Sequence, residues 1–349
     1  MPHMKRKDSG VTAAQPKWRL ARNEATVVGL VGALFVLRLV FAAIIDLLPE
    51  EAYYWNYAQH LDFGYLDHPP MVAWLIHLST AVLGNTEFAV RLPALLGWFV
   101  FAWFMYRLTV DLAGKAAGGI VLVFAAVLPI YFSIGILMTP DAPFYVCWAA
   151  CLYFLERALI ADETKAWWWV GVSFGLGMLS KYTMGLLLPA AVVFVLVEAD
   201  SRRWLKRPEP YLAVVIGFLI FSPVLIWNYH HDWMSFSFQG PRRWGGGIRF
   251  SEHVLLAWAV ILLSPVGFVE AVRALVRLCR KRLSVVEEAT AQNKRRLFML
   301  VFSLVPLSVF VLHSVQAPPK LNWTGPVWLA VLPAMAVLVN QSGKTAATW

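Results

Sequence analysis

Residues 25–46 read ATVVGLVGALFVLRLVFAAIID, and this stretch decides the fold class. Only Arg38 and Asp46 in it are charged, and its length suits a helix that crosses a hydrocarbon core of about 30 Å. The whole chain of 349 residues has this character, since 59% of its residues are hydrophobic and only 15% are charged. A soluble domain usually carries about 25% charged residues. The composition therefore excludes an ordinary soluble enzyme, a coiled coil and a disordered chain, and predicts an all-α polytopic membrane protein.

Ten segments are candidate transmembrane helices. They are residues 25–46, 88–110, 117–137, 142–160, 166–180, 183–198, 210–228, 254–275, 297–314 and 325–340. Residues 71–83 are also apolar but are too short for a span, and counting them as one would invert every later loop. We expect them to form an interfacial or re-entrant helix in the first outer loop.

Basic residues set the predicted orientation. With the N-terminus in the cytoplasm, most of the 30 Lys and Arg residues fall on the inner side. The exceptions are Arg38 within the first span and, outside, Arg91, Lys181, Arg242, Arg243, Arg249 and Lys320. This positive-inside pattern explains the net charge of +9 without a nucleic-acid partner.

The same pattern divides the chain into three parts. We expect a cytoplasmic basic tail at 1–24, a transmembrane domain at 25–340 and a short C-terminal tail at 341–349. The first apolar stretch lacks a small-residue cleavage site, so a removed signal peptide is not expected. The three Cys residues fit neither a disulfide framework nor a zinc pattern.

The first outer loop, residues 47–87, concentrates titratable side chains. Glu50 and Glu51 follow Pro49, directly after the first span. Proline and acidic residues suit the first turn of a helix, so capping is one interpretation. The other is a carboxylate held at the bilayer surface to accept a proton. Asp67 and His68 stand before a rigid Pro-Pro pair that fixes their direction.

These stretches resemble the bacterial membrane glycosyltransferases of the protein-O-mannosyltransferase-like class, families 39 and 83, which include the aminoarabinose transferase acting on lipid A. The matching motifs are Glu50-Glu51-Ala52-Tyr53-Tyr54-Trp55, Gly64 to Pro70, Arg91-Leu92-Pro93, Thr139-Pro140-Asp141-Ala142-Pro143, Ser180-Lys181-Tyr182-Thr183 and Lys320-Leu321-Asn322-Trp323. Two features depart from the family pattern. Glu50 stands where the family usually has Asp, and members are often longer, with extra spans or an outer soluble domain.

The resemblance implies a GT-C-type helical bundle with its catalytic loops on the outer, periplasmic face of a bacterial inner membrane. The donor would be a polyprenyl-phosphate sugar and the acceptor a hydroxyl on an envelope lipid, glycan or protein, with inversion at the sugar and no cofactor. The chain has no Gly-rich phosphate loop, which agrees with a lipid-linked donor. The implied catalytic residues are Glu50 as base, Glu51 in an orienting or capping role, and Asp67. The implied phosphate ligands are Lys181, His68, Arg242, Arg243 and Lys320, and the implied substrate contacts are Tyr53, Tyr54, Asp141, Asn322 and Trp323.

Several alternatives remain at this stage. Lys181 between two apolar helices is costly without an anionic partner, which favours a phosphate, but it could also snorkel to the interface. Asp141 could bind sugar hydroxyls, orient a base or cap its helix. The loop with Arg242-Arg243 could close over substrate or be a hydrated turn. Asp67 and His68 could form a metal pair, but no third ligand has helical spacing, so metal-independent chemistry is expected. The alternative function is a lipid or sugar transporter or flippase, although transporters usually place ionisable groups inside their spans.

Overall fold

The computed structural model describes residues 17–240, 250–280 and 287–341, and these residues form helices and turns with no strand. In chain order the elements are α1 (Lys17–Ile44), α2 (Pro49–Gln59), α3 (Met71–Leu83), α4 (Glu87–Ala113), α5 (Lys115–Val127), α6 (Pro129–Ser133), α7 (Asp141–Leu159), α8 (Ala166–Ser180), η1 (Tyr182–Leu186), α9 (Leu187–Val197), η2 (Asp200–Lys206), α10 (Glu209–His230), α11 (Met234–Gln239), α13 (Glu252–Arg280), α14 (Glu287–Ser314), η3 (Gly325–Trp328) and α15 (Leu332–Gln341). The predicted all-α class is confirmed.

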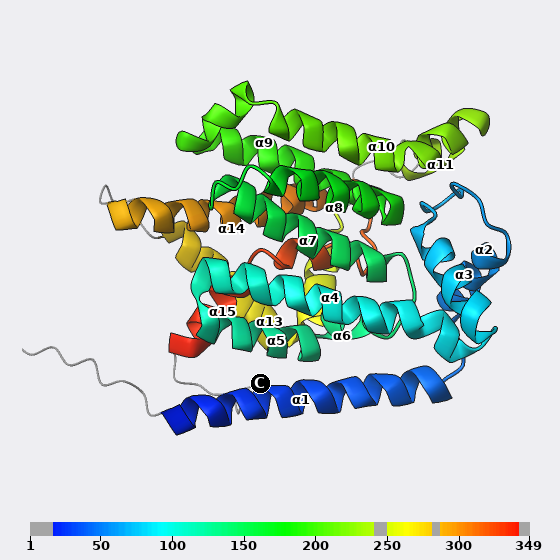
Figure 1. Ribbon diagram of the computed structural model, residues 1–349, viewed down its shortest axis with the longest axis horizontal. Coiled ribbons are helices and arrows are strands. Elements are labelled where there is room, and N and C mark those ends of the chain that lie inside the picture. The colour runs from blue at the N-terminus through cyan, green and yellow to red at the C-terminus, as the bar shows by residue number, and fades with distance from the viewer. Residues whose placement is uncertain (1–16, 241–249, 281–286, 342–349) are drawn as a thin grey trace, which may run out of the picture.

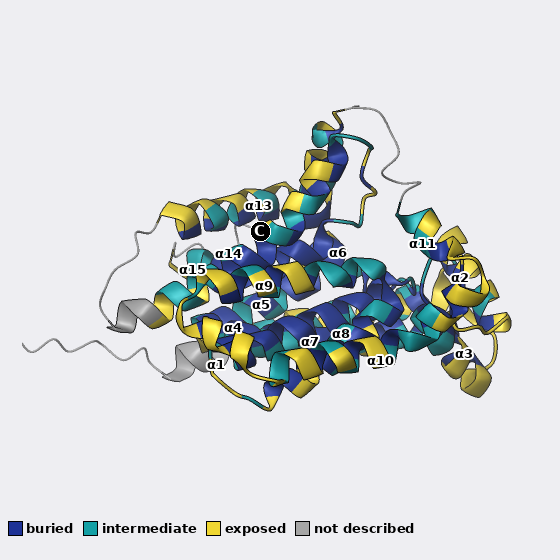
Figure 2. Cartoon of the chain, turned by 90° about the horizontal axis from the view of Figure 1, so that it is seen from above, coloured by how far each residue is buried: buried dark blue, intermediate teal, exposed yellow. Residues whose placement is uncertain are grey.

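The long helices run in roughly the same direction and form an elongated bundle (Figure 1). α1 lies along one side of it, and α2 and α3 cover the end at which α1 finishes and α4 starts (Figure 1). Buried residues lie where the helices face one another, whereas exposed residues line the outside (Figure 2). We call the end with α2 and α3 the loop-one end, and the opposite end, which holds η2, the η2 end.

Every predicted span contains a helix, but the count of about ten spans is not confirmed. Five helices of the described residues are long and apolar enough to cross a membrane, or six if the bent pair Tyr182–Val197 and Asp200–Lys206 is one span. The shorter segments are interrupted for physical reasons. Leu128 is extended at ψ 132°, because Pro129 follows it and disfavours helical geometry at the preceding residue. Lys181, also extended, separates α8 from η1 and α9.

The segment predicted to be too short for a span is helix α3, with the predicted bounds Met71–Leu83. Gly84 ends it at φ 79°, a conformation that favours glycine. Its interfacial or re-entrant placement stays a prediction. α1 begins at Lys17, so the described part of the predicted basic tail is helical.

Small residues bring the central helices together. α7 packs against α4 and α8, and most of its residues are buried. α8 in turn packs against α10 at a glycine pair, Gly171 and Gly175. A Cβ atom on Gly171 would lie 2.6 Å from the Ala213 carbonyl oxygen, so only glycine permits this approach. The tight packing fixes where α7 and α8 present their ends, Asp141 and Lys181, at the loop-one end.

Candidate active site

The site is built on α2, whose rotation is set by Glu51. This side chain is fully buried and forms an ion pair with Arg91 of α4, with 2.6 Å between Nη2 and Oε2. Its oxygens also accept hydrogen bonds from the backbone N–H groups of Leu48, at 3.1 Å, and Met138, at 3.1 Å. Arg91 donates further to the carbonyl of Asp46 at 2.9 Å. Glu51 therefore ties α2 to α4 and to the segment before α7, which fits the predicted orienting or capping role.

Glu50, the adjacent residue, is exposed. Among the described residues its carboxylate has no ion-pair or hydrogen-bond partner. Successive helical positions point about 100° apart, so the inward direction of Glu51 leaves Glu50 directed outward. Glu50 is thus a carboxylate with free lone pairs beside a rigid anchor, the arrangement that a base for an incoming substrate requires.

Tyr54 of α2 is subject to the negative charge of three predicted site carboxylates. Burial raises the pKa of its phenol, and the negative charges of Asp67, Glu50 and Asp141 raise it further. The phenol therefore stays protonated and can act as a hydrogen-bond donor. Its ring also meets His68 edge-on, with centroids 5.8 Å apart. The charges that act on Tyr54 therefore come both from loop one and from α7.

A second ion pair joins the starts of two other segments. Lys181 Nζ lies 2.8 Å from Asp141 Oδ1, and both residues are buried. Asn322 donates to the other oxygen of Asp141 at 2.5 Å. The reason given for a phosphate at Lys181, that this cation lacks an anionic partner, is therefore wrong, because Asp141, 40 residues earlier in the sequence, is its partner. The phosphate-binding role of Lys181 stays a prediction. The capping interpretation of Asp141 is also not supported, since no side-chain hydrogen bond caps α7.

Asp67 is held by aromatic side chains of α2. Its Oδ1 accepts a hydrogen bond from Tyr57 at 2.7 Å, and Tyr57 shares another of 2.5 Å with Tyr53. Tyr57 stacks on Tyr65 with centroids 3.9 Å apart. Burial and the Tyr53 and Asp67 contacts raise the pKa of Tyr57, which keeps it a donor to the carboxylate. The carboxylate of Asp67 is therefore positioned within the loop.

Loop one is also fastened to α10. Trp227 donates from its indole N–H to Asp62 Oδ2 at 2.7 Å, and its ring stacks on His231 at 4.0 Å. Gly64 lies against the same indole, where a Cβ atom would come within 2.8 Å of a ring carbon. The hydrogen bond between Trp227 and Asp62 joins residues 165 positions apart. No local spacing in the sequence signals this contact, the pairing of Arg91 with Glu51 or the hydrogen bond of Tyr57 to Asp67, so none of the three was predicted.

The remaining predicted residues are not gathered in the same way. Lys320 is exposed and has no carboxylate partner among the described residues. Trp323 packs against Phe310 and His313, with ring centroids 5.9 and 4.8 Å away, rather than at the acidic cluster. Arg242 and Arg243 lie outside the described residues. No group of three or more His, Cys, Asp or Glu among the described residues could hold a metal ion. Metal-independent chemistry stays a prediction.

The chain is similar in sequence to known membrane glycosyltransferases. The sequence profile of the family described as dolichyl-phosphate-mannose-protein mannosyltransferase matches residues 67–227. A lipid A galacturonosyltransferase of Rhizobium johnstonii is 24% identical over 298 residues, which are 82% of this chain and 59% of the relative. An undecaprenyl phosphate-alpha-4-amino-4-deoxy-L-arabinose arabinosyl transferase of Pseudomonas fluorescens is 22% identical over 326 residues, 84% of this chain and 51% of the relative.

Solved structures of glycosyltransferases have a similar fold. The crystal structure of ArnT from Cupriavidus metallidurans bound to undecaprenyl phosphate matches with a TM-score of 0.70 at 17% identity, covering 91% of this chain and 60% of that one. The chain has the GT-C fold. The resemblance of its sequence to the protein-O-mannosyltransferase-like membrane glycosyltransferases is confirmed. The archaeal oligosaccharyltransferase of Archaeoglobus fulgidus shares the GT-C fold more distantly, with a TM-score of 0.56. The chain spans about 50–60% of the length of the two curated relatives described here.

Proposed function

We propose that this chain is a membrane glycosyltransferase that moves a sugar from a polyprenyl-phosphate donor to a hydroxyl acceptor at the outer face of a bacterial inner membrane. The observation that carries the proposal is the loop-one end itself. This end holds an exposed carboxylate, Glu50, and a buried Asp141–Lys181 pair, and the charges of Glu50 and Asp141 both raise the pKa of the Tyr54 phenol. The named relatives are glycosyltransferases, which supports the same reaction class.

Glu50 acts as the base in this proposal. It takes the proton of the acceptor hydroxyl while that oxygen attacks the anomeric carbon from the side opposite the phosphate. The bond between the anomeric carbon and the phosphate oxygen breaks, and its electron pair leaves with the polyprenyl phosphate. One displacement inverts the sugar. General-base help of this kind contributes about 10²–10⁴ in rate.

Lys181 contributes to phosphate binding, and Asp141 positions it. An ammonium group has three donors, and Asp141 uses one of them at 2.8 Å. The others remain for a phosphate oxygen, whose charge grows as the sugar leaves. His68, whose ring meets that of Tyr54 edge-on, and Lys320 complete the set of predicted donors among the described residues.

The names of the relatives suggest the class of donor and acceptor. One is named for lipid A and others for aminoarabinose carried on undecaprenyl phosphate. We therefore expect undecaprenyl phosphate as the carrier and an envelope lipid or glycan as the acceptor. The N-terminus is cytoplasmic in this proposal, because the basic last turn of α13, with Arg277 and Arg280, and the basic helix η2 lie at the η2 end.

The test is an assay in detergent with purified full-length chain, a panel of undecaprenyl-phosphate sugars and lipid A as acceptor. Release of undecaprenyl phosphate that depends on acceptor supports a transferase. Since detergent leaves no barrier to cross, a transporter or flippase would bind the donor without consuming it. Binding of each donor without release under these conditions would overturn the proposal in favour of transport.

A further inference from the structure

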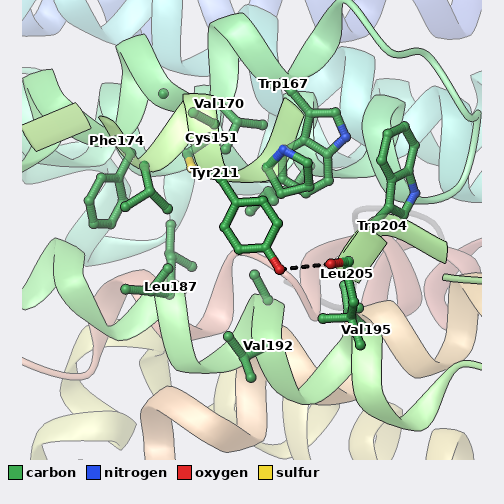
Figure 3. A pocket seen from close by; sticks show the side chains of 17 residues that line it. Cys151, Trp167, Val170, Phe174, Leu187, Val192, Val195, Trp204, Leu205 and Tyr211 are labelled. Atoms are coloured by element: carbon green, nitrogen blue, oxygen red, sulfur yellow. Dashed lines mark hydrogen bonds between the residues drawn. The ribbon is translucent and has the colours of Figure 1, made fainter. Parts of the chain in front are cut away.

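A second site lies at the η2 end, away from loop one. A cavity of about 170 Å³ lies between α7, α8, α9, η2 and α10 (Figure 3). None of the 17 side chains drawn around it is charged. Its polar side-chain groups are the phenol of Tyr211, which already donates to the Leu205 carbonyl at 2.8 Å, the thiol of Cys151 and the indole N–H groups of Trp167 and Trp204, which are buried. The cavity lining therefore suits an apolar chain better than a charged headgroup.

The cavity is deep on one side and open on the other. Leu187 and Trp204 of its lining are 1% exposed, whereas Val192 is 48% and Tyr211 56% exposed. The exposed residues belong to the apolar outer faces of α9 and α10, which a bilayer would cover. Ligand pockets for whole small molecules are usually about 300–1,000 Å³. This smaller space therefore suits part of one lipid tail.

Residues next to the cavity mark the level of lipid headgroups. Trp168 and Trp169 of α8 are 54% and 56% exposed, directly after the lining residue Trp167. Exposed tryptophans of this kind favour the membrane interface. The η2 end of the cavity thus reaches the level at which a lipid of this leaflet has its glycerol and phosphate, and the rest of the cavity lies at the level of its acyl chains.

Helix η2 supplies the charge that selects a headgroup. Arg203 pairs with Asp162, and Arg207 pairs with Glu209 at 2.7 Å. Arg202 donates from Nε to the Leu196 carbonyl at 2.9 Å, and among the described residues neither Arg202 nor Lys206, both exposed, has a carboxylate partner. The acidic groups facing this rim are Asp162, Glu198, Asp200 and Glu209, and Glu198 lies 3.4 Å from Lys294. Two cations next to Trp204 and Leu205 therefore remain available to an anion.

We propose that this cavity binds one acyl chain of an anionic phospholipid whose phosphate is held by Arg202 and Lys206. Basic pockets between membrane helices at the cytoplasmic side are suited to anionic headgroups. The site is separate from the sugar-transfer chemistry, because α2 and α3 lie at the opposite end of the bundle (Figure 1). Its occupant is a structural lipid of the leaflet at the η2 end.

Binding of the acyl chain is tested with substitutions that fill the cavity with a larger side chain. The full chain in mild detergent is equilibrated with dioleoyl phosphatidylglycerol, and native mass spectrometry counts the retained lipid. Val192→Phe and Leu188→Phe, both at lining positions, should reduce retention at least several-fold. Val197→Phe is the matched control, since Val197 is an exposed residue of the same helix that does not line the cavity. Equal retention in Val197→Phe and both lining variants would overturn the site.

The headgroup is tested by competition between phosphatidylglycerol and phosphatidylcholine with the same chains. A cation near the surface contributes about a five-fold preference for an anionic lipid, so Arg202→Gln/Lys206→Gln should reduce the preference by about 30-fold. Arg277→Gln, an exposed cation on α13, is the control and should leave it unchanged. No preference in the unaltered protein would overturn the proposal. Displacement of phosphatidylglycerol by undecaprenyl phosphate at equal concentration would also overturn it, and would assign the cavity to the carrier lipid.

Discussion

Glu51→Gln should destabilise the fold far more than the same change at the adjacent Glu50. Glu51 and Arg91 are both fully buried, and their ion pair lies 2.6 Å apart. Removing the charge of one partner leaves the other buried and unpaired, which costs about 3–5 kcal/mol. A glutamine also cannot satisfy Arg91 and the N–H groups of Leu48 and Met138 together. Glu50 is exposed, so its neutralisation should change stability by about 0.5 kcal/mol or less.

Thermal unfolding of the purified chain in one detergent measures the difference. At roughly 2 °C per kcal/mol, the Tm of Glu51→Gln should fall by about 6–10 °C. The variant Glu51→Gln/Arg91→Gln should lose less than the sum of its single changes, because it leaves no unpaired charge. Equal Tm values for Glu50→Gln and Glu51→Gln would refute the reasoning, as would simple additivity of the double change.

Three further outcomes are expected. Glu50→Gln should lower turnover about 10²–10⁴-fold with donor affinity nearly unchanged, and Glu50→Asp should keep substantial activity; full activity of Glu50→Gln would remove it from the chemistry. Lys181→Met should lower both Tm and affinity for undecaprenyl phosphate, and adding Asp141→Asn should restore Tm alone; restored affinity would show that Lys181 does not contact phosphate. In intact cells, an impermeant thiol reagent should label Gly240→Cys but reach the exposed native Cys279 only after permeabilisation, and the reverse pattern would invert the topology.

The sequence predicted what depends on local pattern. Helix α3 and helix α8 have the predicted bounds, because Pro70, Gly84 and the Ser180–Lys181 break are local signals. Helix lengths were harder to predict, since Pro129 divides an apolar run that hydropathy alone reads as continuous. The partners within the site could not be predicted. Each ion pair joins residues 40 positions apart, and the identity of a buried partner depends on how α7 packs between α4 and α8.

The two buried ion pairs explain why catalysis would be placed on an adjacent exposed residue. A carboxylate surrounded by donors of its own chain, as Glu51 is, has its oxygens occupied by hydrogen bonds within the protein. The same bonds fix the rotation of α2, and the helix geometry then fixes the direction of Glu50 without any contact to Glu50 itself. Asp141 relates to Lys181 in the same way, because its carboxylate accepts one hydrogen bond from the ammonium group and leaves the other two N–H donors for a substrate in the proposed mechanism. In both cases a buried group supplies rigidity to a group that stays available, and holding reacting groups in place before substrate arrives lowers the barrier to transfer. If α2 shifted by one residue, Glu50 would take the buried position of Glu51, and Glu51 would become exposed. In the proposed mechanism, the Glu51–Arg91 pair therefore determines which of the two carboxylates is available as the base.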